Sequence, residues 1–97
     1  MYNAKKHTPW GYADTVTEIA PGITLYTTPG HGGYHVSAER YKAMPAQYRA
    51  CSFTKDQWFE EDCSWCAVVL SWPGLFAPEM VDAAKVCYEV VYARRVA

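Results

Sequence analysis

The longest uninterrupted pattern of polar and apolar positions covers residues 54–72, and it predicts a core helix. Thr54 and Gln57 have the spacing of a capping box, in which two side chains bond free N–H groups at a helix start. Asp56 and residues 60–62 are acidic, and the helix dipole favours negative charge near the start. No residue from 63 to 72 is charged, so this half should be buried on nearly every side. Pro73-Gly74 should end the helix.

A second long helix is predicted from Pro78. Proline suits the first helical position, and Glu79 at the start and Arg94 and Arg95 at the end match the helix dipole. Apolar residues then recur every three or four positions and form a stripe that should face the core. The stripe consists of Met80, Val81, Ala84, Cys87, Tyr88 and Val91. The solvent face is marked by Asp82, Lys85 and Glu89.

Three strands are predicted in the first part of the chain, over residues 14–19, 23–28 and 34–36. The first is rich in β-branched residues, and the second alternates most clearly between its two faces. Pro21-Gly22 fits the middle of a type II turn, in which glycine supplies the positive φ. Residues 14–37 should therefore form a three-stranded antiparallel meander.

Shorter elements complete the prediction. Ser37 can cap a short helix over residues 38–43, and residues 45–53 should be a loop or a loose helical turn. Residues 1–9 are expected to be a flexible lead-in, and the turn over residues 8–11 should anchor Trp10 on the core. The expected fold class is α+β, with a small three-stranded antiparallel sheet packed against two long helices plus one short helix. All of it should form a single domain, residues 1–97.

The composition supports a folded domain and argues against several classes of function. Of the 97 residues, 51% are hydrophobic, which is enough for one modest core. The formal net charge of −1 gives no basic excess with which to bind nucleic acid or an anionic membrane. No signal peptide is visible, and no apolar run reaches the roughly 18 residues of a membrane span. The expected location is the cytoplasm, where cysteines stay reduced.

The loop of Gly30, His31, Gly32 and Gly33 is the first candidate for chemistry. Glycines let the backbone turn tightly and approach a ligand closely, and His31 can act as a base, a metal ligand or a hydrogen-bond donor. An ordinary glycine-rich turn with His31 in water explains the same residues. The glycine spacing matches no phosphate-binding or dinucleotide-binding motif.

Glu60, Glu61 and Asp62 form the second candidate. Neighbouring carboxylates can supply an acid–base pair or, with His31 and His35, a metal site. On a helix the three cannot face one point, because Glu60 and Asp62 would lie about 200° apart. The plainer explanation is a solvated helix start. An intermediate one is that one carboxylate reaches the glycine loop and orders it.

Cys63 and Cys66 form a CxxC motif. A zinc site would need two further ligands from Cys51, Cys87 or His31. A redox pair is disfavoured because the acidic residues just before the motif raise a thiol pKa. Buried, inert thiols are the favoured interpretation. No cofactor, metal or catalytic residue is predicted, and no nucleophile motif such as GxSxG or HExxH is present.

Large apolar side chains exceed what a core of this size obviously needs. They are Trp10, Trp58, Phe59, Trp72, Leu75 and Phe76. Small domains use large aromatics to complete the core, and any that stay exposed are candidates for a protein contact.

Three patches of the sequence resemble a family of unknown function. They are Thr8-Pro9-Trp10-Gly11, the stretch from Gly22 to Gly33 with its HGG turn, and the stretch from Trp58 to Cys63 with its EED step. Members of that family are small or appended domains in phage, plasmid and other mobile-element proteins of bacteria. The resemblance covers roughly residues 8–75 and implies no settled activity. The signature residues that it implies here are His31, Gly32, Gly33, Glu60, Glu61 and Asp62.

The setting of that family implies a phage or mobile-element accessory protein that blocks a host defence complex, such as a CRISPR effector. The expected mechanism is protein–protein contact that competes with nucleic acid or subunit binding. The expected contact residues are Asp56, Trp58, Glu60, Glu61 and Asp62. No direct binding to nucleic acid, membrane or small molecule is expected. Two alternatives stay open: an enzyme or metal-dependent site on His31 with Glu60 or Glu61, and a small structural zinc protein.

Overall fold

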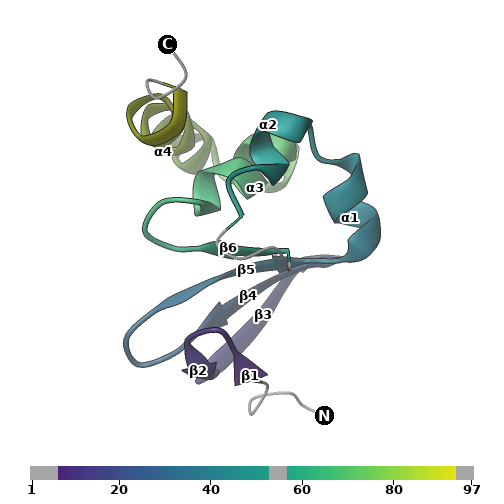
Figure 1. Cartoon of the computed structure of the whole chain (residues 1–97), viewed down its shortest axis with the longest axis vertical. Helices are drawn as coiled ribbons and strands as arrows, with labels where there is room; N and C mark the ends of the chain where they lie inside the picture. Colours follow the sequence, from purple (N-terminus) through teal and green to yellow (C-terminus); the bar gives the residue numbers. More distant parts are fainter. Residues whose placement is uncertain (1–6, 53–56, 94–97) are drawn as a thin grey trace.

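The computed structural model describes residues 7–52 and 57–93. These residues form a four-stranded antiparallel sheet, in the order β3-β4-β5-β6, and a separate two-stranded sheet, β1-β2. The helices lie along one side of the larger sheet, and the β1–β2 hairpin lies toward its other side (Figure 1). The sheet is therefore the middle layer of the part of the chain that is described.

The bounds of the elements follow the chain order. The strands are β1 His7–Thr8, β2 Gly11–Tyr12, β3 Thr15–Ala20, β4 Ile23–Thr27, β5 Gly32–Val36 and β6 Trp58–Glu60. The helices are α1 Ala38–Ala43, α2 Ala46–Arg49, α3 Trp65–Ser71 and α4 Pro78–Tyr88, with a 3-10 turn η1 at Pro73–Leu75 and a π-helical turn η2 at Glu89–Ala93. None of the helices within the described ranges has both the length and the apolar character needed to cross a membrane.

The predicted meander is present as β3, β4 and β5. Gly22 has a φ of 86°, as the turn between β3 and β4 requires. The short helix α1 is also confirmed, with its predicted cap: the Oγ of Ser37 accepts a hydrogen bond of 3.1 Å from the backbone N–H of Arg40. Proline and glycine positions and cap chemistry were thus sufficient to place these elements.

The prediction of a helix over residues 54–72 was wrong, and so was the three-stranded sheet. Trp58–Glu60 is a fourth strand that pairs with β5, and the helical part, α3, contains only seven residues, Trp65–Ser71. Thr54 and Asp56 lie outside the described residues. The end of the helix was correct, because α3 stops just before Pro73.

The geometry of residues 57–60 explains the error. Gln57 has a left-handed φ of 72°, which a helix cannot contain, and its Nε2 donates a hydrogen bond of 2.7 Å to the carbonyl of Val36. Phe59 is 0% exposed and points into the core, while its neighbours on either side are only half-buried. This alternation is the two-residue period of a strand. A three-residue strand is too short for that period to stand out in the sequence.

The second predicted helix begins at Pro78, as expected, and is the one helix of considerable length in the part of the chain that is described. It has 11 α-helical residues and continues through the five-residue π-helical turn η2. Ala84 of the predicted stripe is buried against α3. The expected solvent-facing residues Asp82, Lys85 and Glu89 are exposed. Arg94 and Arg95 lie outside the described residues.

The last residues of the predicted N-terminal lead-in form part of a hairpin. His7–Thr8 pairs with Gly11–Tyr12, so the predicted turn is the tip of a small hairpin. The Oγ1 of Thr8 donates a hydrogen bond of 2.7 Å to the carbonyl of Gly11 and closes that turn. Residues 7–9 of the expected lead-in therefore belong to this hairpin. Residues 1–6 lie outside the described ranges.

The main core lies between the sheet and the helices. Ile23, Val36 and Phe59 from three strands meet Val68 of α3 and Met44 after α1. Each of these side chains is at most 1% exposed. A smaller cluster between α3 and α4 extends the core away from the sheet. The helical layer is thus held to one face of the sheet by apolar contacts, which leaves the other face for the hairpin.

Candidate functional site

The glycine loop and the acidic step lie side by side in the fold. Gly33 of β5 is paired with Glu60 of β6, and the backbone N–H of Glu61 donates a hydrogen bond of 2.8 Å to the carbonyl of Gly32. The strand that the sequence pattern did not predict is the reason for this contact. We call the surface around Gly32, Gly33, Glu61 and Asp62 the β5–β6 junction.

The loop before the junction is a tight turn closed by a threonine. The backbone N–H of Thr28 and its Oγ1 both donate to the carbonyl of His31, each at 2.7 Å. The Oγ1 of Thr28 also accepts from the backbone N–H of His31 at 3.1 Å. Pro29, Gly30 and His31 are exposed. These hydrogen bonds between Thr28 and His31 hold the shape of the turn without a metal or ligand.

The acidic step is a second tight turn. The Oγ of Ser64 accepts a hydrogen bond of 2.6 Å from the backbone N–H of Glu60, and the carboxylate of Glu60 accepts one of 2.8 Å from the backbone N–H of Cys63. Glu60 is half-buried, whereas Glu61 and Asp62 are exposed. The three carboxylates therefore differ in their surroundings: Glu60 shapes the turn, and Glu61 and Asp62 are exposed at its surface.

Four aromatic rings cover the face of the sheet that is turned away from the helices. The ring of Trp58 lies 4.6 Å from that of His35, 5.2 Å from that of Tyr26 and 5.6 Å from that of Trp10, between ring centroids. Trp10 comes from the β1–β2 hairpin, so this cluster attaches the hairpin to the sheet. The predicted anchor at Trp10 is present, although it lies on this outer face and not in the main core.

The remaining large apolar residues divide between the core and the surface. Phe59 is fully buried, and Phe76 is half-buried with its ring 5.9 Å from that of Tyr34. Leu75 is 43% exposed. Most of the apparent excess of aromatics is thus used in packing. Trp58, the aromatic residue expected at a partner contact, is half-buried within the outer cluster.

Charge is divided between the two layers. In residues 7–36 and 57–64, which hold the strands, there is no Lys or Arg. The carboxylates of this layer are Asp14, Glu18, Glu60, Glu61 and Asp62. The basic residues of the described ranges all lie in the helical layer, at Arg40, Lys42, Arg49 and Lys85. The sheet layer, as far as it is described, therefore presents negative charge alone.

His31 and the carboxylates considered for an enzyme site lie on neighbouring turns. The exposed His31 makes no hydrogen bond or ion pair with Glu60 or Glu61 in the described structure. Within residues 7–52 and 57–93, no group of three or more His, Cys, Asp or Glu side chains is arranged to hold a metal ion.

The four cysteines carry thiol groups and form no disulfide, and they lie on or next to α2, α3 and α4. The Sγ atoms of Cys66 and Cys87 both donate to the carbonyl of Cys63, at 3.3 and 3.5 Å. Burial, and next the neighbouring Cys87, raise the pKa of Cys51 to about 11. The same two causes raise the pKa of Cys66. The thiolate is the reactive form of cysteine, and a raised pKa makes it rarer. Cys51 and Cys66 should therefore be unreactive.

We expect Cys51 to react with iodoacetamide at pH 8 about a hundredfold more slowly than in the unfolded chain, because its thiolate fraction is that much smaller. Mass spectrometry of the labelled peptides measures this, and labelling in denaturant is the control. Because the folded pKa is raised, the stabilisation from the neutral thiol should be present below pH 9 and decline as the pH rises toward about 11. Equal labelling rates in the folded and unfolded chain would contradict the prediction.

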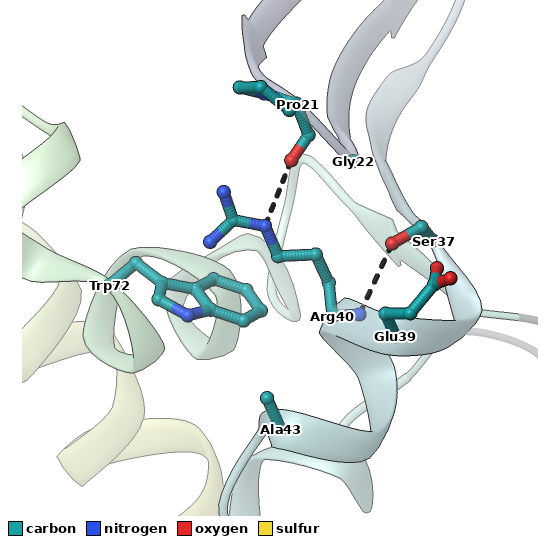
Figure 2. A pocket seen from close by; sticks show the side chains of 7 residues that line it. All are labelled: Pro21, Gly22, Ser37, Glu39, Arg40, Ala43 and Trp72. Carbon is teal, nitrogen blue, oxygen red and sulfur yellow. Dashed lines mark hydrogen bonds between the residues drawn. The ribbon is translucent and has the colours of Figure 1, made fainter.

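A separate hollow lies among the β3–β4 turn, α1 and the end of α3 (Figure 2). Its centre is Arg40, whose guanidinium carbon lies 5.0 Å from the ring centroid of Trp72. No pattern in the sequence indicates a role for Arg40. Its position three residues after Ser37 marks it as part of the helix start, but no local pattern connects it to Trp72. This pairing depends on the packing of α1 beside α3.

The geometry defines a small α+β domain with an acidic sheet layer and one arginine-centred hollow. The chain belongs to the family described as Domain of unknown function (DUF7007), whose model matches residues 3–95. The match includes α4 and so extends beyond the residues on which the sequence resemblance rested. No curated protein and no solved structure matches the chain significantly.

Proposed function

We propose that this protein is a non-catalytic binding protein whose acidic sheet layer covers a basic surface of a protein partner. The observation that carries the proposal is the division of charge. Within the described ranges, the sheet layer contains Asp and Glu but no Lys or Arg, and every Lys and Arg lies in the helical layer. Such a face is complementary to a basic surface, and complementary charge directs both association and orientation.

The contact is centred on Glu61 and Asp62. Both are exposed at the tip of the turn after β6, beside the exposed turn that contains His31. The Glu60 carboxylate and Ser64 hold this tip in one conformation. A fixed acidic tip loses less side-chain freedom on binding than a flexible one would.

The partner to test first is a host defence complex with a basic nucleic-acid channel, such as a CRISPR effector. The resemblance to domains of phage and other mobile elements motivates this choice. Protein surfaces that bind nucleic acid are rich in Lys and Arg, and an acidic protein face can compete for them. In this proposal the protein inhibits by occupying the channel or its entrance.

The test is inhibition of DNA binding by a panel of purified effector complexes, with the full-length protein added. We expect Glu61→Lys/Asp62→Lys to weaken the inhibition at least about tenfold, because two attractive charges become repulsive. Asp82→Lys/Glu89→Lys is the matched control, since it makes the same change of net charge at exposed positions in the helical layer. Its inhibition should stay near that of the unmodified protein.

Two results would count against the proposal. If no effector in the panel loses DNA binding when the unmodified protein is added, the choice of partner is wrong. If both double variants weaken inhibition equally, inhibition depends on the net charge of the protein and not on the acidic face. Circular dichroism of both variants establishes that each keeps the fold.

A further inference from the structure

Arg40 is held in place on three sides. Its Nε donates a hydrogen bond of 2.9 Å to the carbonyl of Pro21, and its guanidinium lies over the ring of Trp72. Its side-chain stem lies so close to Gly22 that a Cβ on Gly22 would be 2.9 Å from the Cγ of Arg40. An arginine restrained in this way has already lost much of its side-chain freedom before any ligand arrives.

The outer end of the same guanidinium carries its two terminal nitrogens. Neither terminal nitrogen makes a hydrogen bond or ion pair with another residue of the described ranges, including the neighbouring Glu39. Figure 2 shows the two terminal nitrogens at the end of the Arg40 side chain, above the ring of Trp72 in this view. The four N–H groups on these nitrogens form the fork that binds planar oxyanions through two parallel hydrogen bonds.

The hollow has room for a small group beside this fork. Its volume is about 400 Å³, and apolar surface from Pro21, Ala43 and Trp72 lines part of it. Pockets that bind small ligands have volumes of roughly 300–1,000 Å³ and few polar groups. The hollow therefore combines one oriented cationic group with apolar walls.

The local charge selects the class of anion. Among the described residues, Arg40 is the one cation lining the hollow, and Glu39 at its edge is negative. A dianion such as phosphate would therefore meet repulsion and a single positive charge from these residues. A carboxylate carries a single charge and has the planar geometry of the fork. An apolar group attached to the carboxylate would lie against Trp72 and Ala43.

We propose that the Arg40–Trp72 hollow binds a carboxylate carried on a small apolar group. Two sources share this chemistry: a free small carboxylic acid, and the carboxyl-terminal residue of a peptide. The site is on the helical layer, away from the β5–β6 junction, and the proposal does not depend on the acidic face binding a partner. It assigns a ligand site to residues that the sequence patterns did not identify.

The experiment titrates the full-length protein with N-acetyl-L-phenylalanine, and with its neutral amide as the matched control ligand. The indole N–H signal of Trp72 in NMR spectra reports binding. We expect a saturable shift with a dissociation constant on the order of 1 mM, and at least about tenfold weaker binding of the amide, which cannot accept the bidentate pair. A tetrapeptide ending in phenylalanine, with a free or an amidated terminus, distinguishes the two sources.

Variants locate the binding. Arg40→Lys should weaken it at least about tenfold, because an ammonium group has no planar fork. Ala43→Leu narrows the hollow without touching any restraint on Arg40, and should weaken binding even if Arg40→Lys disturbs the β3–β4 turn. Lys42→Met, which removes an exposed cation from the same helix but outside the hollow, should leave binding unchanged. Equal binding of acid and amide, or unchanged binding in Ala43→Leu, would overturn the proposal.

Discussion

Gly33→Ala is expected to lower the free energy of unfolding by about 2–3 kcal/mol, and the melting temperature by about 10 °C or more. A Cβ at Gly33 would lie 2.7 Å from the ring tip of Trp10 and 2.8 Å from the Cα of Glu60, and would also overlap the carbonyl oxygen of Phe59. Two of these three contacts are with the backbone of β6, which cannot move without breaking its pairing with β5.

The neighbouring glycine provides the control. Gly30 has open space where its Cβ would be and no positive φ, so Gly30→Ala should be neutral or stabilise by up to about 1 kcal/mol. Thermal unfolding of both variants, followed by circular dichroism, makes the comparison. Adding Trp10→Ala to Gly33→Ala should not restore stability, because the backbone contacts remain. Equal stability of the Gly30 and Gly33 variants would mean that β6 is not paired at Gly33.

Phe59→Ala should be more damaging, with a loss of about 3–5 kcal/mol. Phe59 is 0% exposed, and its side chain belongs to the core cluster between the sheet and the helices. A domain of this size has about 5–15 kcal/mol of stability in total, so this variant could approach complete unfolding. Phe59→Leu is the milder version, and its cost should be about 1–2 kcal/mol.

Trp58→Ala is the matched comparison for Phe59→Ala. Trp58 precedes Phe59 but lies on the opposite face of the sheet, where it is half-buried among three other rings. We expect its loss to cost about 1–2 kcal/mol and to loosen the β1–β2 hairpin more than the core. Urea unfolding, fitted with one m value for both variants, measures their free energies of unfolding. A larger loss from Trp58→Ala than from Phe59→Ala would contradict the assignment of faces in β6.

Local chemistry allowed several elements to be predicted from the sequence. The Pro21-Gly22 turn, the Ser37 cap and the Pro78 helix start each depend on residues within one turn of each other. The stripe around Ala84 could be predicted because a helix of this length repeats its pattern several times. The pattern over residues 54–72 failed for the opposite reason. The three residues of β6 are too few to show a period, and the acidic run after them is equally suited to a helix start and to a surface turn.

The candidate sites were harder to predict than the elements, because they depend on contacts between residues far apart in the chain. The sequence indicated the glycine loop and the acidic step separately, but their contact required the pairing of Gly33 with Glu60. The sequence could not distinguish Glu60, which holds a turn, from Glu61, which is exposed. Three acidic residues in a row give no local sign of which side chain will form a hydrogen bond. The Arg40 hollow had no local signal, since Trp72 reaches Arg40 only after α3 packs beside α1.

The sequence alone thus determined where the chain turns, which segments can be helical and that an apolar core forms, because these follow from backbone restrictions and side-chain spacing. The tertiary structure decided which strand completes the sheet, which carboxylates face water and which arginine lies over Trp72. These features arise when residues far apart in the chain compete to bury apolar surface and satisfy polar groups, and only one arrangement does both.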